Sequence, residues 1–191
     1  MKIINIIGNG ENRLNFNMLK LDGYKIGCNA SYRDHDLDCL VAIDKRLVTE
    51  ALASGFKNDI YTRSEWMRNF INSPNVKEVP KLPYVGNLRE DSQWHWGTGC
   101  SAANLAATMD PDEIHLWGFD LWDNNQKINN VYKGTNNYKT ENDKGVDPRI
   151  WIYQLKKCFE EYPNITWVQN QIIGWKTPDE WTQLNLRINL S

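Results

Sequence analysis

Small and hydrogen-bonding residues recur directly after the apolar runs of this sequence, where they could bind a ligand. A glycine lets a ligand approach the backbone closely, and free backbone N–H groups bind phosphate oxygens. Asn and Asp side chains hydrogen-bond the hydroxyl groups of a ribose or of an acceptor molecule. The positions that follow apolar runs in this way are Gly8, Asn9, Gly10, Asn29, Asp44, Gly118 and Asp120.

A further Gly-rich segment precedes an Ala-rich stretch. Thr98 and Gly99 open this stretch, which has the small residues of a helix packed close to a sheet. The first N–H groups of such a helix, with the Thr98 hydroxyl, could hold a phosphate. Plainer roles stay open, because a Gly-Asn-Gly segment is often only a turn and Asp44 could simply cap the helix that follows it. The chain contains neither GxGxxG nor GxxxxGK[ST], so it has no dinucleotide fingerprint and no P-loop.

His95 is the best candidate for an acid or base among the three histidines. It lies between Trp94 and Trp96, just before the Thr98 segment, although packing or a phosphate contact are alternative roles. Asp120 is the second candidate. His115 lies within a predicted strand and is expected to pack, and the run around His35 is too loosely spaced to predict a metal site.

Short apolar runs alternate with longer helical stretches, which is typical of a parallel sheet covered on both faces. Strands are expected over residues 2–7, 25–29, 39–43, 59–61, 76–79, 113–118 and 165–168, and helices over 45–54, 63–71, 99–108 and 149–162. The sequence therefore predicts an α/β protein, a single Rossmann-like three-layer domain over 1–170 with a mostly parallel sheet. Residues 171–191 are expected to form a terminal helix or an oligomer contact. In such sheets ligands bind outside the carboxyl ends of the strands, which would bring the positions above to one cleft.

A polar segment with seven Asn lies between Asp120 and Pro148. Loops of this length are uncommon in compact domains and are usually functional or disordered. We interpret residues 121–148 as a lid over the cleft, with Tyr132 and Tyr138 as its candidate ligand contacts.

Composition limits the class of protein. The chain has 191 residues, 41% of them hydrophobic, and a net charge of −2, which disfavours nucleic acid as a partner without excluding it as an acceptor. Four Cys without CxxC spacing are expected to be buried, reduced thiols. No run of 18 apolar residues and no signal peptide is found, so no membrane association is expected and a cytoplasmic setting is predicted.

Three stretches together resemble a known family. They are IINIIGNGENRLNFNMLK, GCNASYRDHDLDCLVAIDKRLV and HWGTGCSAANLAATMDPDEIHLWGFDLW, and they span most of residues 2–122. In order and spacing they are similar to the bacterial sialyltransferases that build lipooligosaccharide caps, a metal-independent family that uses CMP-sialic acid. A weaker likeness is to archaeal hydroxymethylpterin pyrophosphokinases.

The sialyltransferase resemblance implies roles for individual residues. Asn9 and Gly10 would lie by the donor phosphate, Asn29 and Asp44 by the nucleotide, and Thr98 and Gly99 along the CMP site. Gly118 and Asp120 match the family's Gly-x-Asp segment. Tyr132 or Tyr138 could contact a leaving phosphate. The family's catalytic His has no counterpart, because no His occurs in residues 129–150.

These observations predict a glycosyltransferase-like enzyme that uses a nucleotide-sugar donor, most simply a CMP-linked one, with no cofactor and no metal. His95 or Asp120 would deprotonate the acceptor. Two alternatives remain open, namely a nucleotide-binding module without transferase activity and a pyrophosphokinase-type phosphoryl transfer on the same fold. A homo-oligomer is compatible with each of these three functions.

Overall fold

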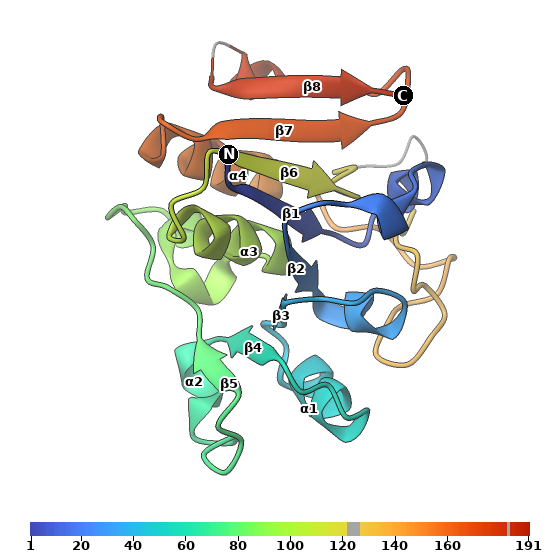
Figure 1. The fold of residues 1–191 in the computed structure, drawn as a ribbon, viewed down its shortest axis with the longest axis vertical. Coiled ribbons are helices and arrows are strands. Elements are labelled where there is room, and N and C mark those ends of the chain that lie inside the picture. The colour runs from blue at the N-terminus through green and yellow to red at the C-terminus, as the bar shows by residue number, and fades with distance from the viewer. Residues whose placement is uncertain (122–126, 183) are drawn as a thin grey trace.

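A single eight-stranded parallel sheet organises the chain. The computed structural model describes residues 1–121, 127–182 and 184–191, and its strands lie in the order β5-β4-β3-β2-β1-β6-β7-β8 (Figure 1). Every neighbouring pair of strands is parallel. The α/β class and the parallel sheet are confirmed. The strands are β1 (Ile3–Ile7), β2 (Tyr24–Cys28), β3 (Cys39–Val41), β4 (Asp59–Thr62), β5 (Val76–Glu78), β6 (Glu113–Trp117), β7 (Thr166–Gln171) and β8 (Leu186–Leu190).

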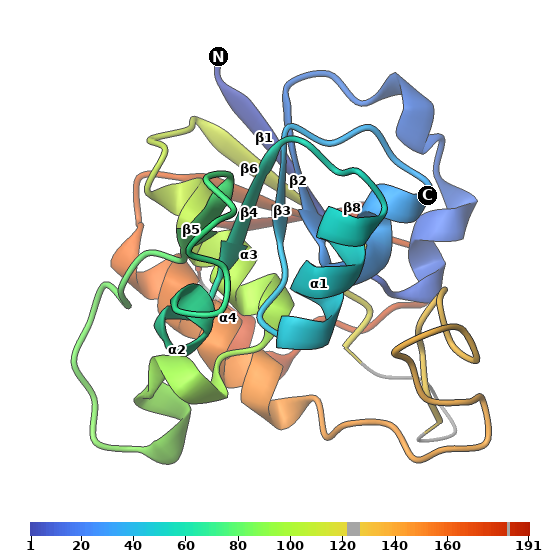
Figure 2. The same ribbon diagram turned by 90° about the horizontal axis from the view of Figure 1, so that it is seen from below.

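Both faces of the sheet are covered, which makes three layers. Figure 2 shows α3 (Thr98–Ala107) and α4 (Arg149–Glu161) on one side of the sheet and α1 (Lys45–Ala53) on the other. The core divides accordingly, because Ile4 and Ile6 pack in one apolar cluster while Ile7 packs in the other. Consecutive side chains of a strand point to opposite faces, so a strand covered on both sides reads as a continuous apolar run.

The helices agree with the sequence prediction except for the second. α2 covers only Ser64–Met67 and ends in tight turns, with the Phe70 N–H donating to Met67 O at 3.0 Å. Among the described residues, no helix combines the length and apolar character that crossing a membrane requires.

The last twenty residues contain a short 3₁₀ helix, Asp179–Trp181, and end in a strand, β8, where a terminal helix was one of the two expectations. β8 pairs in parallel with β7 along the edge of the sheet, with Leu186 opposite Trp167. The run LRINL alternates apolar and polar residues with period two, which is a strand signal. Residues 171–191 therefore continue the same sheet.

The four cysteines are buried free thiols, as predicted. Burial raises the pKa of the Cys28 thiol to about 12. These thiols are packing residues in the core and are not nucleophiles.

The order in which successive strands are added to the sheet reverses between β1 and β6. β2 to β5 extend the sheet on one side of β1, and β6 to β8 extend it on the other. The loops after β1 and β6 leave the sheet next to each other at its carboxyl edge. This switch point is the position where open α/β sheets bind their ligands.

Candidate functional site

Three glycines hold the loops after β1 and β6 against each other. The Gly8 N–H donates to Trp117 O at 2.8 Å and the Gly10 N–H donates to Gly118 O at 2.9 Å. Gly118 has a φ of +67°, and a Cβ at Gly8 would lie 2.7 Å from Gly118 O. The N–H groups of Gly8 and Gly10 thus donate to carbonyl groups of the protein itself. Because these glycines have no side chain, the loop after β6 packs directly against them.

Asp120 lies buried beneath the β1 loop. Its side chain is 3% exposed, and a Cβ at Gly10 would meet its carboxylate within 2.6 Å. Burial raises the pKa of Asp120 to about 6, although the hydrogen bond from the Asn12 N–H at 2.8 Å opposes the shift. The carboxylate therefore braces the β1 loop from within the protein.

Asn29 and Thr98 meet at the carboxyl edge. The Thr98 hydroxyl donates to Asn29 Oδ1 at 3.0 Å, which joins the end of β2 to the first turn of α3. Asn29 has a φ of +54°, a left-handed conformation that few residues other than glycine adopt and that often marks functional sites. A Cβ at Gly99 would lie 2.8 Å from the Phe119 ring, so this glycine allows α3 to approach the β6 loop. The structure thus brings Asn29 and Thr98 together as the sequence predicts.

Tyr138 points into the same edge from the segment that we interpret as a lid, of which the structure describes Leu121 and residues 127–148. Its hydroxyl accepts hydrogen bonds from Asn9 Nδ2 at 3.1 Å and from the Ala30 N–H at 3.3 Å. Burial raises the pKa of Tyr138, so the hydroxyl keeps its proton near neutral pH. Among the described residues, no acceptor for the hydroxyl proton of Tyr138 is found, and Asn9 Oδ1 is buried without a hydrogen-bond donor. The arrangement leaves one donor and one acceptor for a ligand.

A buried arginine fastens the lid to the β1 loop. The Arg13 side chain is 1% exposed and donates to Gly8 O at 3.1 Å, Asp34 Oδ2 at 3.0 Å and the Tyr132 hydroxyl at 2.7 Å. Tyr132 in turn donates to the other oxygen of Asp34. The Val131 N–H donates to Asn9 O at 2.9 Å, which continues the attachment along the backbone.

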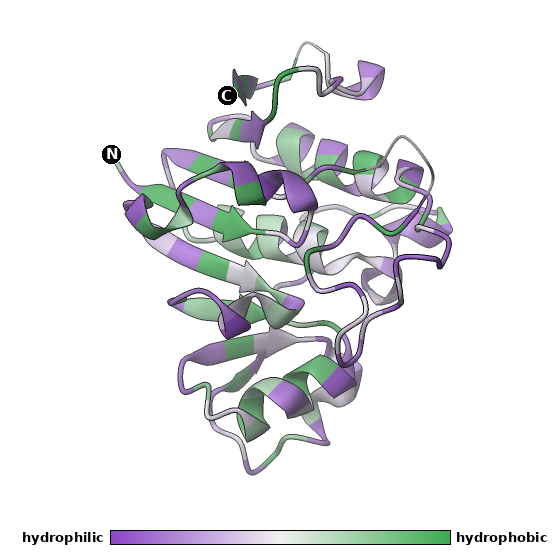
Figure 3. Cartoon of the chain, turned by 90° about the vertical axis from the view of Figure 1, so that its right-hand side faces the viewer, coloured by the Kyte–Doolittle hydropathy of each residue, from purple (hydrophilic) through white to green (hydrophobic). Residues whose placement is uncertain are grey.

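A second ion pair holds the tip of the lid. Arg33 donates to Glu50 Oε1 at 2.8 Å and to Thr135 Oγ1 at 2.8 Å, and Asn137 donates to Glu50 Oε2 at 2.6 Å. The Arg33 guanidinium also lies 5.4 Å from the centre of the Tyr132 ring. The lid is therefore docked over the ends of β1 and β2. Figure 3 looks onto the carboxyl ends of β6, β7 and β8 and shows the lid in mostly hydrophilic colours.

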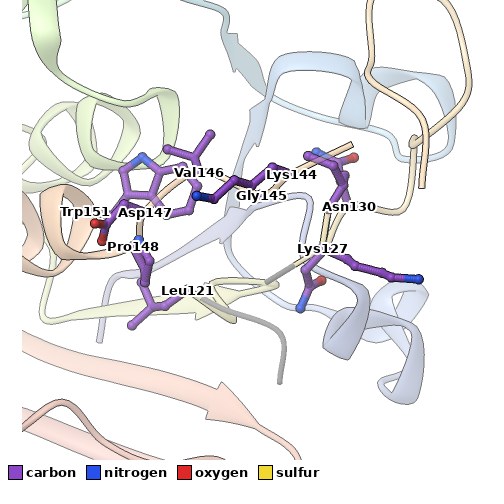
Figure 4. A pocket seen from close by; sticks show the side chains of 11 residues that line it. Leu121, Lys127, Asn130, Lys144, Gly145, Val146, Asp147, Pro148 and Trp151 are labelled. Atoms are coloured by element: carbon purple, nitrogen blue, oxygen red, sulfur yellow. The ribbon is translucent and has the colours of Figure 1, made fainter. Parts of the chain in front are cut away.

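A pocket of about 540 Å³ lies between the base of the lid and the start of α4. Figure 4 shows the Lys144 side chain reaching across it toward the Trp151 indole. Leu121, which lines the pocket after β6, has a φ of +70°, a strained conformation for a bulky residue. The wall consists of Leu121, Lys127, Ile128, Asn129, Asn130, Lys144, Gly145, Val146, Asp147, Pro148 and Trp151. An aromatic ring beside an ammonium group suits a ligand that combines a flat ring with negative charge.

The Trp151 ring connects this pocket to the first turn of α3. A Cβ at Gly97 would lie 2.8 Å from the indole nitrogen. Gln154 accepts a hydrogen bond from the Gly97 N–H at 3.1 Å and donates to His95 O at 3.1 Å. α4 thus fixes the His95–Gly97 turn beside the pocket, although His95 itself is not among the lining residues.

His95 and Asp44 lie farther along the edge. His95 is half-buried in a short 3₁₀ helix, Gln93–His95, and its Nε2 accepts a hydrogen bond from Arg89 Nε at 3.4 Å. Asp44 is exposed at the N-cap of α1 and makes no capping hydrogen bond with its side chain. Asp120 is buried under the β1 loop, so the two predicted catalytic residues occupy different environments. In the part of the chain that the structure describes, no three His, Cys, Asp or Glu side chains gather to hold a metal ion.

Sequence reasoning missed Arg13, Arg33, Lys144 and Trp151. The burial of Arg13 has no local sequence signal, because two of its three partners, Asp34 and Tyr132, lie more than twenty residues away in the chain. The Trp151 position had a weak signal, since a large aromatic in the first turn of a helix faces whatever loop precedes it. Trp122, which follows the Gly-x-Asp segment, lies outside the described residues.

Comparison with known proteins places the fold. No family model and no curated protein matches the chain. Among solved structures, the monofunctional α-2,3-sialyltransferase Cst-I from Campylobacter jejuni has a TM-score of 0.62 at 14% identity, covering 88% of this chain and 75% of that one. The sialyltransferase CstII from the same organism, in complex with cytidine-5'-monophosphate, has a TM-score of 0.59 at 13% identity, covering 88% and 79%. The chain has the fold of these sialyltransferases, as its three motif stretches predict.

Proposed function

We propose that the protein is a glycosyltransferase that binds a nucleotide-sugar donor, a CMP-linked one, at the carboxyl edge of β1, β2 and β6. The observation that carries the proposal is the pocket of about 540 Å³ with Trp151 and Lys144 in its wall, since the Trp151 ring packs on Gly97, which directly precedes Thr98 of the Asn29–Thr98 pair. CstII, which shares the fold, was solved with cytidine-5'-monophosphate. Free thiols fit a reducing compartment, which supports action in the cytoplasm.

The donor contacts follow from the unused polar groups. The base would stack against Trp151, and the ribose hydroxyls would bond Asn29 and the free oxygen of Asn9. The phosphate would accept a hydrogen bond from the Tyr138 hydroxyl and lie within reach of the Lys144 ammonium. Donors fixed in advance around a leaving phosphate stabilise the charge that develops there during transfer.

The transfer step needs a base for the acceptor. The acceptor oxygen would attack the anomeric carbon of the sugar while the bond from that carbon to the phosphate oxygen breaks. The acceptor proton would pass to the imidazole of His95, whose Nε2 lies 3.4 Å from Arg89 Nε. The departing phosphate would keep both electrons of the broken bond. Asp120, buried under the β1 loop, supports this geometry without touching the acceptor.

Thermal shift with and without magnesium tests the donor class. We expect CMP to raise the melting temperature without metal, and UDP, GDP and ATP to raise it less. A ligand at a hundred times its dissociation constant stabilises the native state by about 2.7 kcal/mol. Trp151→Ala should weaken CMP binding, whereas Trp167→Phe, at a fully buried core position, should leave it unchanged after correction for stability.

Turnover separates the alternatives. The transferase would be supported if the wild-type protein hydrolyses CMP-sialic acid or transfers its sugar, and if His95→Ala loses this activity but still binds CMP. Binding of CMP without turnover over a broad acceptor panel would instead indicate a binding module. A shift that requires magnesium and ATP would favour phosphoryl transfer and contradict the proposal.

A further inference from the structure

An exposed tryptophan stands at the carboxyl edge of β3 and β4, away from the pocket. Trp94 is 43% exposed, and its ring centre lies 5.9 Å from that of Trp66 at an interplanar angle of 50°. The Arg63 guanidinium lies 5.0 Å from the centre of the Trp94 ring. We call Trp94, Trp66 and Arg63 the aromatic platform.

The platform is held rigidly. The Trp66 indole N–H donates to Ile43 O at 2.9 Å, which ties this ring to the end of β3. Trp94 lies in the 3₁₀ helix Gln93–His95, whose neighbouring residue Gln93 donates to Pro80 O at 2.8 Å. Such a rigid aromatic surface binds a ring with little loss of side-chain entropy.

Arg63 has donors that the protein does not use. Its Nε is buried without a hydrogen-bond partner, and the described residues give its guanidinium no ion pair. Burial lowers the pKa of Arg63, and the nearby carboxylates of Asp44 and Glu65 oppose that shift. Because the side chain is only half-buried, the outer N–H groups of the guanidinium are the ones that a ligand could reach.

Asp44 supplies the complementary acceptor. It follows β3 and Arg63 follows β4, so the two parallel strands place a carboxylate and a guanidinium side by side at one edge. The carboxylate is exposed and makes no capping bond. A donor group and an acceptor group beside an open aromatic face match a ring that carries neighbouring hydroxyl groups.

We propose that the aromatic platform and Asp44 bind a pyranose ring of a saccharide acceptor. The apolar face of the ring would stack on the exposed face of Trp94, and its hydroxyls would accept from Arg63 and donate to Asp44. The assignment as acceptor subsite rests on the proposed function, because His95 lies directly after Trp94 and before the turn that packs on Trp151. The base would then stand between acceptor and donor.

Saturation-transfer NMR with a panel of neutral and acidic oligosaccharides, without nucleotide, tests the site. We expect at least one saccharide to bind, and Trp94→Ala to weaken it at least about tenfold, the loss typical of truncating an aromatic anchor. Trp94→Tyr, which keeps an aromatic face, should restore most of the affinity. Tyr24→Ala is the matched control, since Tyr24 is 37% exposed but lies at the amino end of β2.

The outcomes separate this proposal from the proposed function. Unchanged saccharide binding in Trp94→Ala, or no saccharide bound by the wild-type chain, would overturn the platform assignment. A nucleobase that binds at Trp94 in competition with CMP would overturn it as well. Saccharide binding that depends on Trp94 in a chain that binds no nucleotide would leave the platform standing and refute the donor site. CMP affinity is expected to be equal in wild type and Trp94→Ala.

Discussion

Replacing Arg13 with methionine should detach the lid from the sheet. The methionine keeps most of the apolar stem but removes the guanidinium that donates to Gly8 O, Asp34 and the Tyr132 hydroxyl. Because these three partners belong to the β1 loop, the segment after β2 and the lid, one side chain couples three parts of the site.

The size of the effect follows from the exposure of each partner. The Asp34 side chain is 45% exposed, so water can replace the guanidinium there and losing the Arg13–Asp34 ion pair adds little to the cost. Gly8 O is buried and Tyr132 is only 6% exposed, and each would lose a partner at about 1–3 kcal/mol. We expect a total of roughly 2–6 kcal/mol, which for a domain of this size lowers Tm by roughly 4–24 °C.

Urea unfolding and amide hydrogen exchange measure the two consequences. Exchange over residues 127–148 should accelerate in Arg13→Met under conditions where the core strands stay protected. A double-mutant cycle with Tyr132→Phe should give a coupling free energy of about 0.5–3 kcal/mol. Arg187→Met is the control, because the Arg187–Glu113 pair is exposed on the arginine side and worth at most about 1 kcal/mol. Equal lid exchange in Arg13→Met and wild type would refute the reasoning.

Three further predictions follow from the same contacts. The pKa of Asp120 is raised to about 6, so between about pH 4 and pH 6 the native state keeps the proton that the unfolded chain loses. The free energy of unfolding should therefore fall by about 3 kcal/mol as the pH rises through this window. Urea titrations should show this slope flattened in Asp120→Asn. Gly118→Ala should cost more than Gly134→Ala in thermal unfolding, because both have positive φ (+67° and +75°) but only Gly118 has backbone atoms within 3.1 Å of the added carbon; equal costs would contradict the loop packing. Tyr138→Phe should reduce transferase kcat by about 10–100-fold with little change in the KM of the nucleotide-sugar donor, as expected for a donor group that stabilises the charge developing on the leaving phosphate; a change in that KM alone would assign the hydroxyl to ground-state binding.

Much of the fold was predictable because its signals are local. The continuous apolar run of β1 and the Ala-rich stretch of α3 each carry their own evidence, and the bounds agree with the structure to within one or two residues. The terminal helix, one of the two expectations for the end of the chain, was wrong, since the alternation in LRINL covers only five residues and competes with a helical interpretation of a longer tail. α2 was overestimated because helical periodicity does not report where turns tighten.

The candidate site divides in the same way. The sequence alone predicted that Asn29 and Thr98 meet at one edge, because parallel strands and the helices that follow them must present their carboxyl-end residues there, and the two side chains are in contact. Only the tertiary structure decided that Gly8, Gly10 and Gly118 pack against one another, that Asp120 is buried beneath them, and that Arg13 joins the lid to the loop. The physical reason is that strand pattern and turn chemistry act over a few residues, whereas burial and hydrogen-bond pairing depend on segments that are distant in the chain and meet only when it folds.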